Sequence, residues 1–224
     1  MRYVKTKLKF LITVIILISL LAGVLILGGQ KEEIKTETEK IRIGSVKGLK
    51  LIVVVDNYPD SELKTAWGLS ILAKTPKNTI LFDTGPDPEV LEHNMNTLKV
   101  DVEDIDFIII SHEHGDHVGG MPYLERVKPG ITVYVPRGMD MKTVNYLMKN
   151  FKVIEVERPK VIARGVVSSG PLYGGVYEQA VAIYVKNRGL VILTGCSHPG
   201  IEYIVSFFHN ITELPIYAVI GGFH

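Results

Sequence analysis

The sequence predicts an α/β domain, with β-sheets covered by helices, joined to one N-terminal transmembrane helix. Runs of β-branched residues alternate with helical patterns from residue 49 to residue 220, as in a domain built from both kinds of element. An uncharged apolar run precedes them at residues 10–29. Three histidines and an aspartate directly follow one predicted strand, at residues 112–117. This cluster points to chemistry at the end of a sheet.

The apolar run is predicted to be a membrane anchor. Phe10 to Gly29 carries no charge and is apolar on every side, whereas a buried core helix would keep a polar stripe. Its length matches the roughly 20 helical residues that span a bilayer. The run is longer than the apolar part of a signal peptide, and no Ala-x-Ala cleavage site follows it. Residues 1–30 are therefore interpreted as an anchor or uncleaved signal, in preference to a cleaved signal peptide.

Charge separates this segment from the rest of the chain. Of 25 lysines and arginines, four lie in residues 1–30, which contain no acid. The positive-inside rule then predicts a membrane-anchored protein whose main domain is extracytoplasmic. The remaining 21 basic residues face 24 acidic ones, and this balance, with no basic stripe, argues against a nucleic-acid partner. The single cysteine excludes a disulfide framework and a four-cysteine zinc site.

The body of the chain is predicted to be one domain. The charge-rich Gln30–Lys40 stretch is interpreted as a solvated linker, so residues 31–48 form a linker and first strand region and residues 49–224 the domain. A helix is predicted from Pro88 to about Leu98, because Asp87 suits the N-cap and proline the first helical position. β-branched runs predict strands, with a hairpin turn at 76–78, at residues 49–55, 69–74, 79–83 and 107–110.

The second half of the domain continues the alternation. Helices are predicted at residues 141–150 and 199–210, the latter with apolar residues on one face. A turn at 186–189 is predicted to join two strands of a hairpin. The predicted strands of this half cover residues 131–135, 153–156, 161–163, 176–185, 190–194 and 216–220.

The histidine cluster SHEHGDH at residues 111–117 is the strongest functional signal. Imidazole nitrogens and carboxylate oxygens are ligands that Zn²⁺ accepts. An extended backbone would direct His112 and His114 to the same side, and the following glycine allows a turn that presents Asp116 and His117 differently. A solvated polar loop is the simpler interpretation, but three of the seven histidines lie in this one loop. The pattern suits two neighbouring metals better than one.

The cluster, after a buried strand and an upstream Asp-Thr-Gly at Asp83, resembles the His-x-His-x-Asp-His signature of the metallo-β-lactamase superfamily. The resemblance implies a four-layer αββα sandwich that holds one or two metals, usually zinc and sometimes iron or manganese. It implies that His112 and His114 bind the first metal and that Asp116 and His117 bind the second. Asp83 then corresponds to a buried aspartate that supports the loop.

Further motifs resemble one branch of that superfamily, named after a dihydropterin-ribofuranosylaminobenzene-phosphate synthase of methanopterin biosynthesis. The similarity covers roughly residues 50 to 224. Its motifs are WGLS at 67–70, LFDTG at 81–85, LTGCSHPG at 193–200 and IGGFH at 220–224.

The sequence departs from the superfamily pattern at the remaining ligand positions. No histidine lies between His117 and His198, where the third histidine of the first metal site is usual. Glu178 lies near that point and is either a ligand or an exposed strand residue. The usual Gly-Asp with a bridging carboxylate is replaced by a glycine and Cys196, which is either a metal ligand or small buried packing. Two positions later, His198 is predicted to be a ligand or proton donor.

The end of the sequence supplies one more candidate ligand. His224 resembles the Gly-Gly-Phe-His element of the branch, and is predicted to complete the second metal site. Because relatives normally continue past this element, the domain is predicted to be C-terminally short.

These features favour a metal-dependent hydrolase of a small-molecule ester, lactone, thioester or phosphoester. The metals would activate a water and polarise the substrate, and Asp116 and His198 are the predicted proton-transferring catalytic residues. The branch resemblance implies one alternative, a synthase-like transferase in methanopterin-type biosynthesis. A second alternative is a catalytically weak, metal-bound surface protein that binds a ligand. Trp67 and Tyr173 are interpreted as core aromatics in preference to pocket residues.

Overall fold

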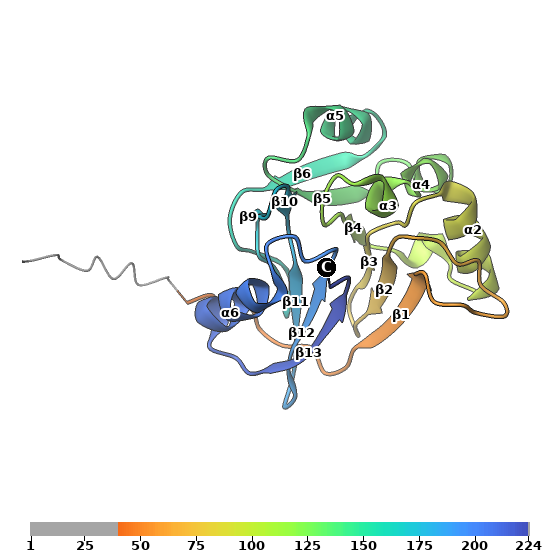
Figure 1. Cartoon of the computed structure of the whole chain (residues 1–224). Helices are drawn as coiled ribbons and strands as arrows, with labels where there is room; N and C mark the ends of the chain where they lie inside the picture. Colours follow the sequence, from red (N-terminus) through yellow and green to blue (C-terminus); the bar gives the residue numbers. More distant parts are fainter. Residues whose placement is uncertain (1–39, 224) are drawn as a thin grey trace, which may run out of the picture. The chain divides into compact units, whose positions relative to one another are not determined.

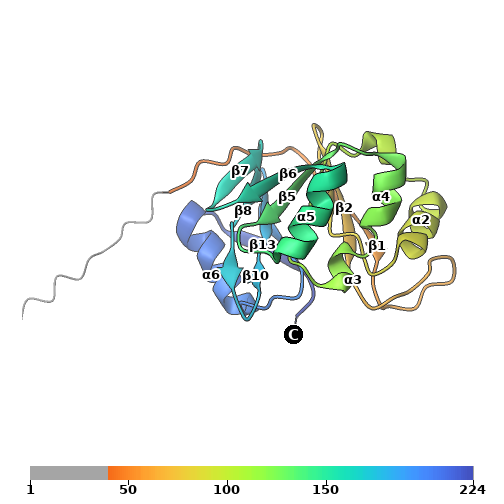
Figure 2. The same cartoon turned by 90° about the horizontal axis from the view of Figure 1, so that it is seen from above.

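Two β-sheets stack face to face in the computed structural model, which describes residues 40–223, and helices cover both outer faces (Figures 1 and 2). The order of layers is helix, sheet, sheet, helix. The predicted αββα arrangement is therefore confirmed for these residues.

The first sheet has six strands in sequence order, and its connections determine where the loops lie. β1 to β3 pair antiparallel and β3 to β6 pair parallel. Parallel neighbours need crossover connections, and helices on the outer face supply them: α2 (Pro88–Thr97), α3 (Gly115–Val118), α4 (Met121–Val127) and α5 (Met141–Asn150). The strands are β1 (Lys50–Val55), β2 (Ser70–Lys74), β3 (Thr79–Phe82), β4 (Phe107–Ile109), β5 (Thr132–Pro136) and β6 (Lys152–Val156).

The second sheet has five strands in the order β13-β12-β11-β8-β7. Its one parallel pair, β12 with β13, is connected through α6 (Ile201–Thr212), which covers the outer face. Its strands are β7 (Lys160–Ala163), β8 (Val166–Ser168), β11 (Val181–Val185), β12 (Gly189–Thr194) and β13 (Ile216–Gly221). The smaller elements are the 3₁₀ turn η1 (Val102–Asp104) and the paired strands β9 (Leu172–Tyr173) and β10 (Tyr177–Glu178).

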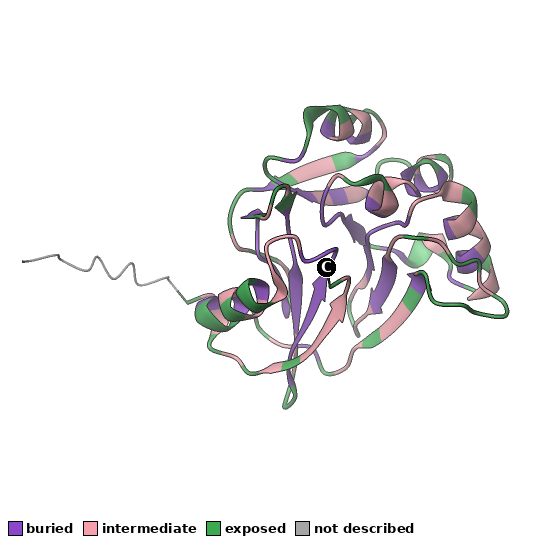
Figure 3. Cartoon of the chain, viewed as in Figure 1, coloured by how far each residue is buried: buried purple, intermediate pink, exposed green. Residues whose placement is uncertain are grey.

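Apolar side chains fill all three spaces between the four layers. In β2, Ile71 faces the second sheet while Leu72 faces the helices, as the two-residue period of a strand requires. On the other side, Ile204 and Phe208 of α6 pack on the outer face of the second sheet. Figure 3 shows the resulting buried strands between partly exposed helices. Strands covered on both faces have few polar residues, which explains the continuous apolar runs of the sequence.

Several elements differ from the sequence prediction, among them two short helices and one divided strand. The helices α3 and α4 were not predicted, because Gly119 and Gly120 disfavour helix by propensity. Packing requires these glycines: a Cβ at Gly119 would lie 1.9 Å from the carbonyl oxygen of Pro86. The single strand predicted at residues 176–185 is divided into β10 and β11, with Gln179 between them. The side-chain amide of Gln179 turns to the first sheet and donates to the carbonyl oxygens of Ile110 and Tyr134.

The predicted localisation is corrected. The expectation was a membrane-anchored protein, associated with the membrane through its N-terminal helix and with an extracytoplasmic domain. This expectation is contradicted, because no helix within residues 40–223 is long and apolar enough to cross a bilayer. The apolar run at 10–29, on which the prediction depended, lies outside the described residues.

The packing of α6 predicts a large cost for truncating its buried face. Phe208 is 0% exposed, and Phe208→Ala should lower the free energy of unfolding by about 3 to 5 kcal/mol. Tyr203, on the same helix, is 53% exposed, so Tyr203→Ala should change stability by less than about 1 kcal/mol. Denaturant unfolding of both variants measures the difference, and equal losses would show that α6 does not pack as described.

Candidate metal centre

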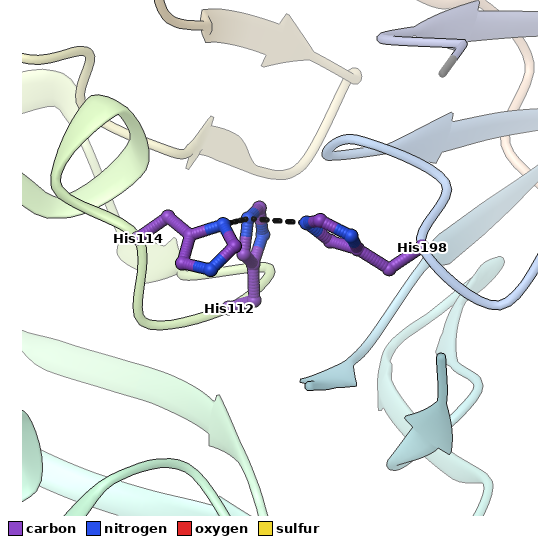
Figure 4. A group of neighbouring side chains, drawn as sticks. All are labelled: His112, His114 and His198. Carbon is purple, nitrogen blue, oxygen red and sulfur yellow. Dashed lines mark hydrogen bonds between the residues drawn. The ribbon is translucent and has the colours of Figure 1, made fainter. Parts of the chain in front are cut away.

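Two loops, one from each sheet, bring the candidate ligands together. The first loop follows β4: the chain leaves the sheet at Ile109, and the short helix α3 then carries Asp116 and His117. The second loop follows β12 and carries Cys196 and His198. Figure 4 shows the imidazole of His198 meeting those of His112 and His114 from the opposite side.

The first group of side chains consists of three histidines. Nε2 of His112 lies 3.0 Å from Nδ1 of His114 and 3.3 Å from Nε2 of His198 (Figure 4). Nitrogen atoms bound tetrahedrally to one zinc ion at 2.0–2.1 Å would be about 3.4 Å apart. The spacing of these rings therefore fits one ion. The sequence has no histidine between His117 and His198, where the third histidine of the first group was expected, and His198 completes this group of three instead.

The second group combines His112 and His117 with Cys196, whose ligand atoms all lie within 4.8 Å of one another. Nε2 of His117 is 3.1 Å from the Cys196 sulfur and 3.5 Å from a carboxylate oxygen of Asp116. Cys196 is buried, but its sulfur faces imidazole nitrogens instead of purely apolar packing. Nitrogen, thiolate and carboxylate donors together suit zinc.

Asp83, directly after β3, supports the first loop as the sequence suggested. One carboxylate oxygen accepts from the Ser111 backbone N–H at 2.7 Å. The other accepts from the Ser111 hydroxyl and from Nδ1 of His117, both at 2.7 Å. Asp83 is completely buried and has a φ of 56°, a left-handed conformation that is rare outside glycine. These contacts fix both the position of the loop and its protons.

The proton positions follow from these hydrogen bonds. The single hydroxyl proton of Ser111 is donated to Asp83, so Ser111 must accept from Nδ1 of His112, 2.8 Å away. Nδ1 of His117 likewise donates to Asp83. In the neutral form of both rings, Nε2 therefore carries the lone pair and faces the other candidate ligands, which is the tautomer that binds metals.

The electrostatics of the two groups differ. Burial, followed by repulsion from the imidazoles of His117, His114 and His198, lowers the pKa of His112 to about 2. Burial also lowers the pKa of His117, but the adjacent carboxylates of Asp83 and Asp116 outweigh it and raise that pKa to about 12. The hydrogen bond with His117 lowers the pKa of Asp116 to about 2. His112 is thus kept neutral, whereas the carboxylates around His117 favour a positive charge at that ring, as a metal cation beside it would supply.

Glu178 is neither a ligand nor an exposed strand residue, so both sequence interpretations are wrong. It is 0% exposed, and its carboxylate holds the second loop. One oxygen accepts from the Thr194 hydroxyl and from the backbone N–H groups of Gly195 and Ser197, at 2.8, 2.9 and 3.2 Å. The other accepts from the backbone N–H of His198 at 2.8 Å. Glu178 thereby positions both Cys196 and His198.

The other residues singled out in the sequence lie in different places, and some lie beside the pocket. Trp67 and Tyr173 were both expected in the core, but they are 63% and 66% exposed; Trp67 lines the pocket beside the site and Tyr173 does not. His224 lies outside the described residues. The pocket has a volume of about 330 Å³, contains Asp116, His117 and Cys196 in its wall, and has no lysine or arginine among its described lining residues. Substrate-sized space therefore lies against the second group of ligands.

The role of Glu178 gives a specific prediction. In Glu178→Gln the amide nitrogen must face either the N–H of His198 or the three donors on the other side, so a buried donor loses its acceptor. We expect a loss of about 1 to 3 kcal/mol in unfolding free energy, measured by denaturant titration, and a displaced His198 in a crystal structure. Glu202→Gln, at an exposed position of α6, is the matched control and should change neither. An undisplaced His198 in the Glu178 variant would contradict the assignment.

Comparison with known proteins agrees with this architecture. A protein-family model described as the metallo-beta-lactamase superfamily matches residues 68–207. The chain is 27% identical to the 7,8-dihydropterin-6-methyl-4-(beta-D-ribofuranosyl)-aminobenzene-5'-phosphate synthase of Methanocaldococcus jannaschii, over 82% of this chain and 80% of the relative.

Solved structures show the same relationship. A metal-dependent hydrolase of the beta-lactamase superfamily is 27% identical, with a TM-score of 0.67 over 79% of this chain and 77% of that chain. A quorum-quenching N-acyl homoserine lactone lactonase, 20% identical, shares the fold, with a TM-score of 0.55 over 81% of this chain and 93% of that chain. The family model covers more than half of the sequence, so the chain belongs to the metallo-beta-lactamase superfamily.

Proposed function

We propose that this protein is a metal-dependent hydrolase of a small-molecule ester, lactone, thioester or phosphoester. The observation that carries the proposal is a pair of candidate ligand groups that share His112, the second of which lines an open pocket through His117 and Cys196. His112, His114 and His198 would hold one divalent ion. His117 and Cys196, with Asp116 beside them, would hold a second. His224 remains a predicted ligand outside the described residues.

Zinc fits the donor set best, with iron or manganese as alternatives. A bound zinc ion supplies an activated water, with a pKa lowered to about 7, and a Lewis acid for the substrate oxygen. The side chains of the protein would bind the substrate and transfer the protons. Asp116 lines the pocket, where its carboxylate would be placed to accept a proton from an attacking water. His198, predicted as either a ligand or a proton donor, has its Nε2 among the ligand atoms of the first group, so the ligand role is the one proposed for it.

The pocket supports a small substrate. Its volume of about 330 Å³ lies at the lower end of the range for small-molecule sites. Apolar side chains, Trp67 and Leu69 among them, form much of its wall. The reacting carbonyl or phosphoryl group would lie near Asp116, and the remainder of the substrate would contact the apolar wall.

One alternative has a specific observation in its favour. The similarity to a named synthase of Methanocaldococcus jannaschii extends over 82% of this chain, which supports a transferase that acts on a dihydropterin. Both reactions would use the same ligands, so the substrate decides between them. A third reading, a metal-bound protein with weak or no catalysis, predicts metal without turnover.

The deciding experiment is elemental analysis of the purified full chain followed by a substrate panel. Turnover of a lactone, thioester or phosphodiester supports the hydrolase. Product formation from a dihydropterin and a ribofuranosylaminobenzene phosphate, with no hydrolysis of the panel, supports the transferase. One or two equivalents of metal with neither reaction supports the binding protein.

The ligand role of His114 can be tested directly. His114→Ala should remove a metal equivalent and lower kcat/KM at least about a hundredfold, because the first ion loses one of three protein ligands. His209→Ala removes an exposed histidine of α6 and should change neither value. Elemental analysis and initial rates provide both measurements. Unchanged metal content in the His114 variant would exclude it as a ligand.

The hydrogen bonds of Asp83 give a second prediction. In Asp83→Asn one carboxylate oxygen becomes an N–H₂ donor, so either the Ser111 N–H or the pair formed by the Ser111 hydroxyl and Nδ1 of His117 loses its acceptor. The loop and the His117 ring are then held less firmly, and metal affinity should fall about 10- to 100-fold, as measured by competition with a chelating dye. Asp104→Asn, at an exposed carboxylate, should retain full affinity. Equal affinities of the parent and the Asp83 variant would show that Asp83 does not position the candidate ligands.

A further inference from the structure

A second hollow lies away from the histidines and is surrounded by basic side chains. It has a volume of about 430 Å³, and four of its seven lining residues are lysine or arginine, with no acid among them. The basic residues are Lys47, Lys77, Arg164 and Lys186, all exposed. Each comes from a different segment, so the fold and not a local run of sequence assembles them.

The hollow is at the opposite end of the strands from the candidate metal centre. β12 begins beside the turn that contains Lys186 and ends at the loop that contains His198. In Figure 1 the β11–β12 hairpin tip accordingly lies below the rest of the second sheet. Five or six strand residues at about 3.3 Å each separate the two ends by roughly 16 to 20 Å. The hollow is therefore a separate site.

The backbone holds these segments in place. Val46, at the floor of the hollow, pairs with Val185, and the N–H of Lys186 donates to the Val46 carbonyl oxygen at 2.9 Å. These contacts bring Lys47 and Lys186 to one side. Across from them, Nε of Arg164 donates to the carbonyl oxygen of Ser45 at 3.3 Å, which leaves its remaining guanidinium N–H groups available.

The four cations form no ion pair with a described acid. Within residues 40–223, no ion pair includes Lys47, Lys77, Arg164 or Lys186. Two acids contact the segment around Lys77 but bind other groups: Asp104 pairs with Lys74, and Asp106 accepts from the Asn78 side chain and the Thr79 N–H. Like charges around one concave surface repel each other and concentrate a positive potential there, which a bound anion relieves.

We propose that this hollow is a binding site for a phosphate-rich anion. Guanidinium groups bind phosphate oxygens in bidentate geometry, and lysines add point charges that suit several phosphate groups at once. A volume of about 430 Å³ accommodates a short chain of phosphates or a phosphorylated headgroup. The site takes either a free phosphorylated metabolite or the phosphorylated headgroup of a lipid, which share this chemistry.

Calorimetric titration of the full chain with tripolyphosphate tests the proposal. We expect saturable binding that weakens with salt, about fivefold weaker in Lys77→Ala and about 25-fold weaker in Lys77→Ala/Lys186→Ala if the effects add. Lys77→Arg preserves the charge and should bind as the parent does. Lys149→Ala, which removes an exposed lysine of α5 outside the hollow, should also bind normally.

Two further measurements separate the alternatives. His114→Ala should keep its tripolyphosphate affinity, and a loss in that variant would assign the anion to the metal centre and overturn the proposal. Co-sedimentation with phosphatidylcholine vesicles, with and without phosphatidylinositol bisphosphate, tests for a lipid source. A lipid headgroup is identified if the parent binds only the vesicles that contain phosphatidylinositol bisphosphate and the double variant does not bind them. Binding to neither probe, or equal binding by parent and double variant, also overturns the proposal.

Discussion

The carboxylate of Asp83 is the contact on which the site depends. It lies between two parallel strands, β3 and β4, and accepts three hydrogen bonds from the loop that follows β4. Buried charge is costly unless it is paired, and here the pairing groups are Ser111 and His117. Any conformation of the loop that removes them leaves the carboxylate unpaired. The hydrogen bonds that hold the loop backbone also set the tautomers of His112 and His117. The candidate ligands therefore reach the tautomer that binds metal when the loop folds.

Glu178 has the corresponding role on the other sheet. It too is fully buried, and it accepts from four groups of the loop after β12. Each sheet thus contributes one loop of candidate ligands, and each loop is held by one buried carboxylate. Because the donors are mostly backbone N–H groups, loop geometry depends little on the side chains it carries. Other side chains at positions 196 and 198 would therefore leave the loop backbone in place, which is consistent with diverse chemistry on one fold.

Sequence patterns predicted most of the strands and the long helices, because the central strands are continuous apolar runs and each long helix carries one apolar face. The histidine cluster was equally clear, since its residues are neighbours in the chain. His198 was predicted as a ligand or proton donor from the motif that contains it, but its place beside His112 and the role of Glu178 were not predicted. Their partners are 86 and 16 to 20 positions away, and no local pattern encodes such distances. The short helices α3 and α4 were missed for a related reason: their glycines are required by tertiary contacts that oppose local helix propensity.

The division of the ligands between two sheets has a mechanical consequence. His112 and His114 belong to the first sheet's loop and His198 to the second sheet's loop, so an ion held by all three would cross-link the two halves of the sandwich. Opening the interface between the sheets would then require the ion to leave, and the free energy of ion binding would add to that of folding. In such a protein the metal-loaded form would also be the most stable form of the chain, and metal supply would set the lifetime of the fold.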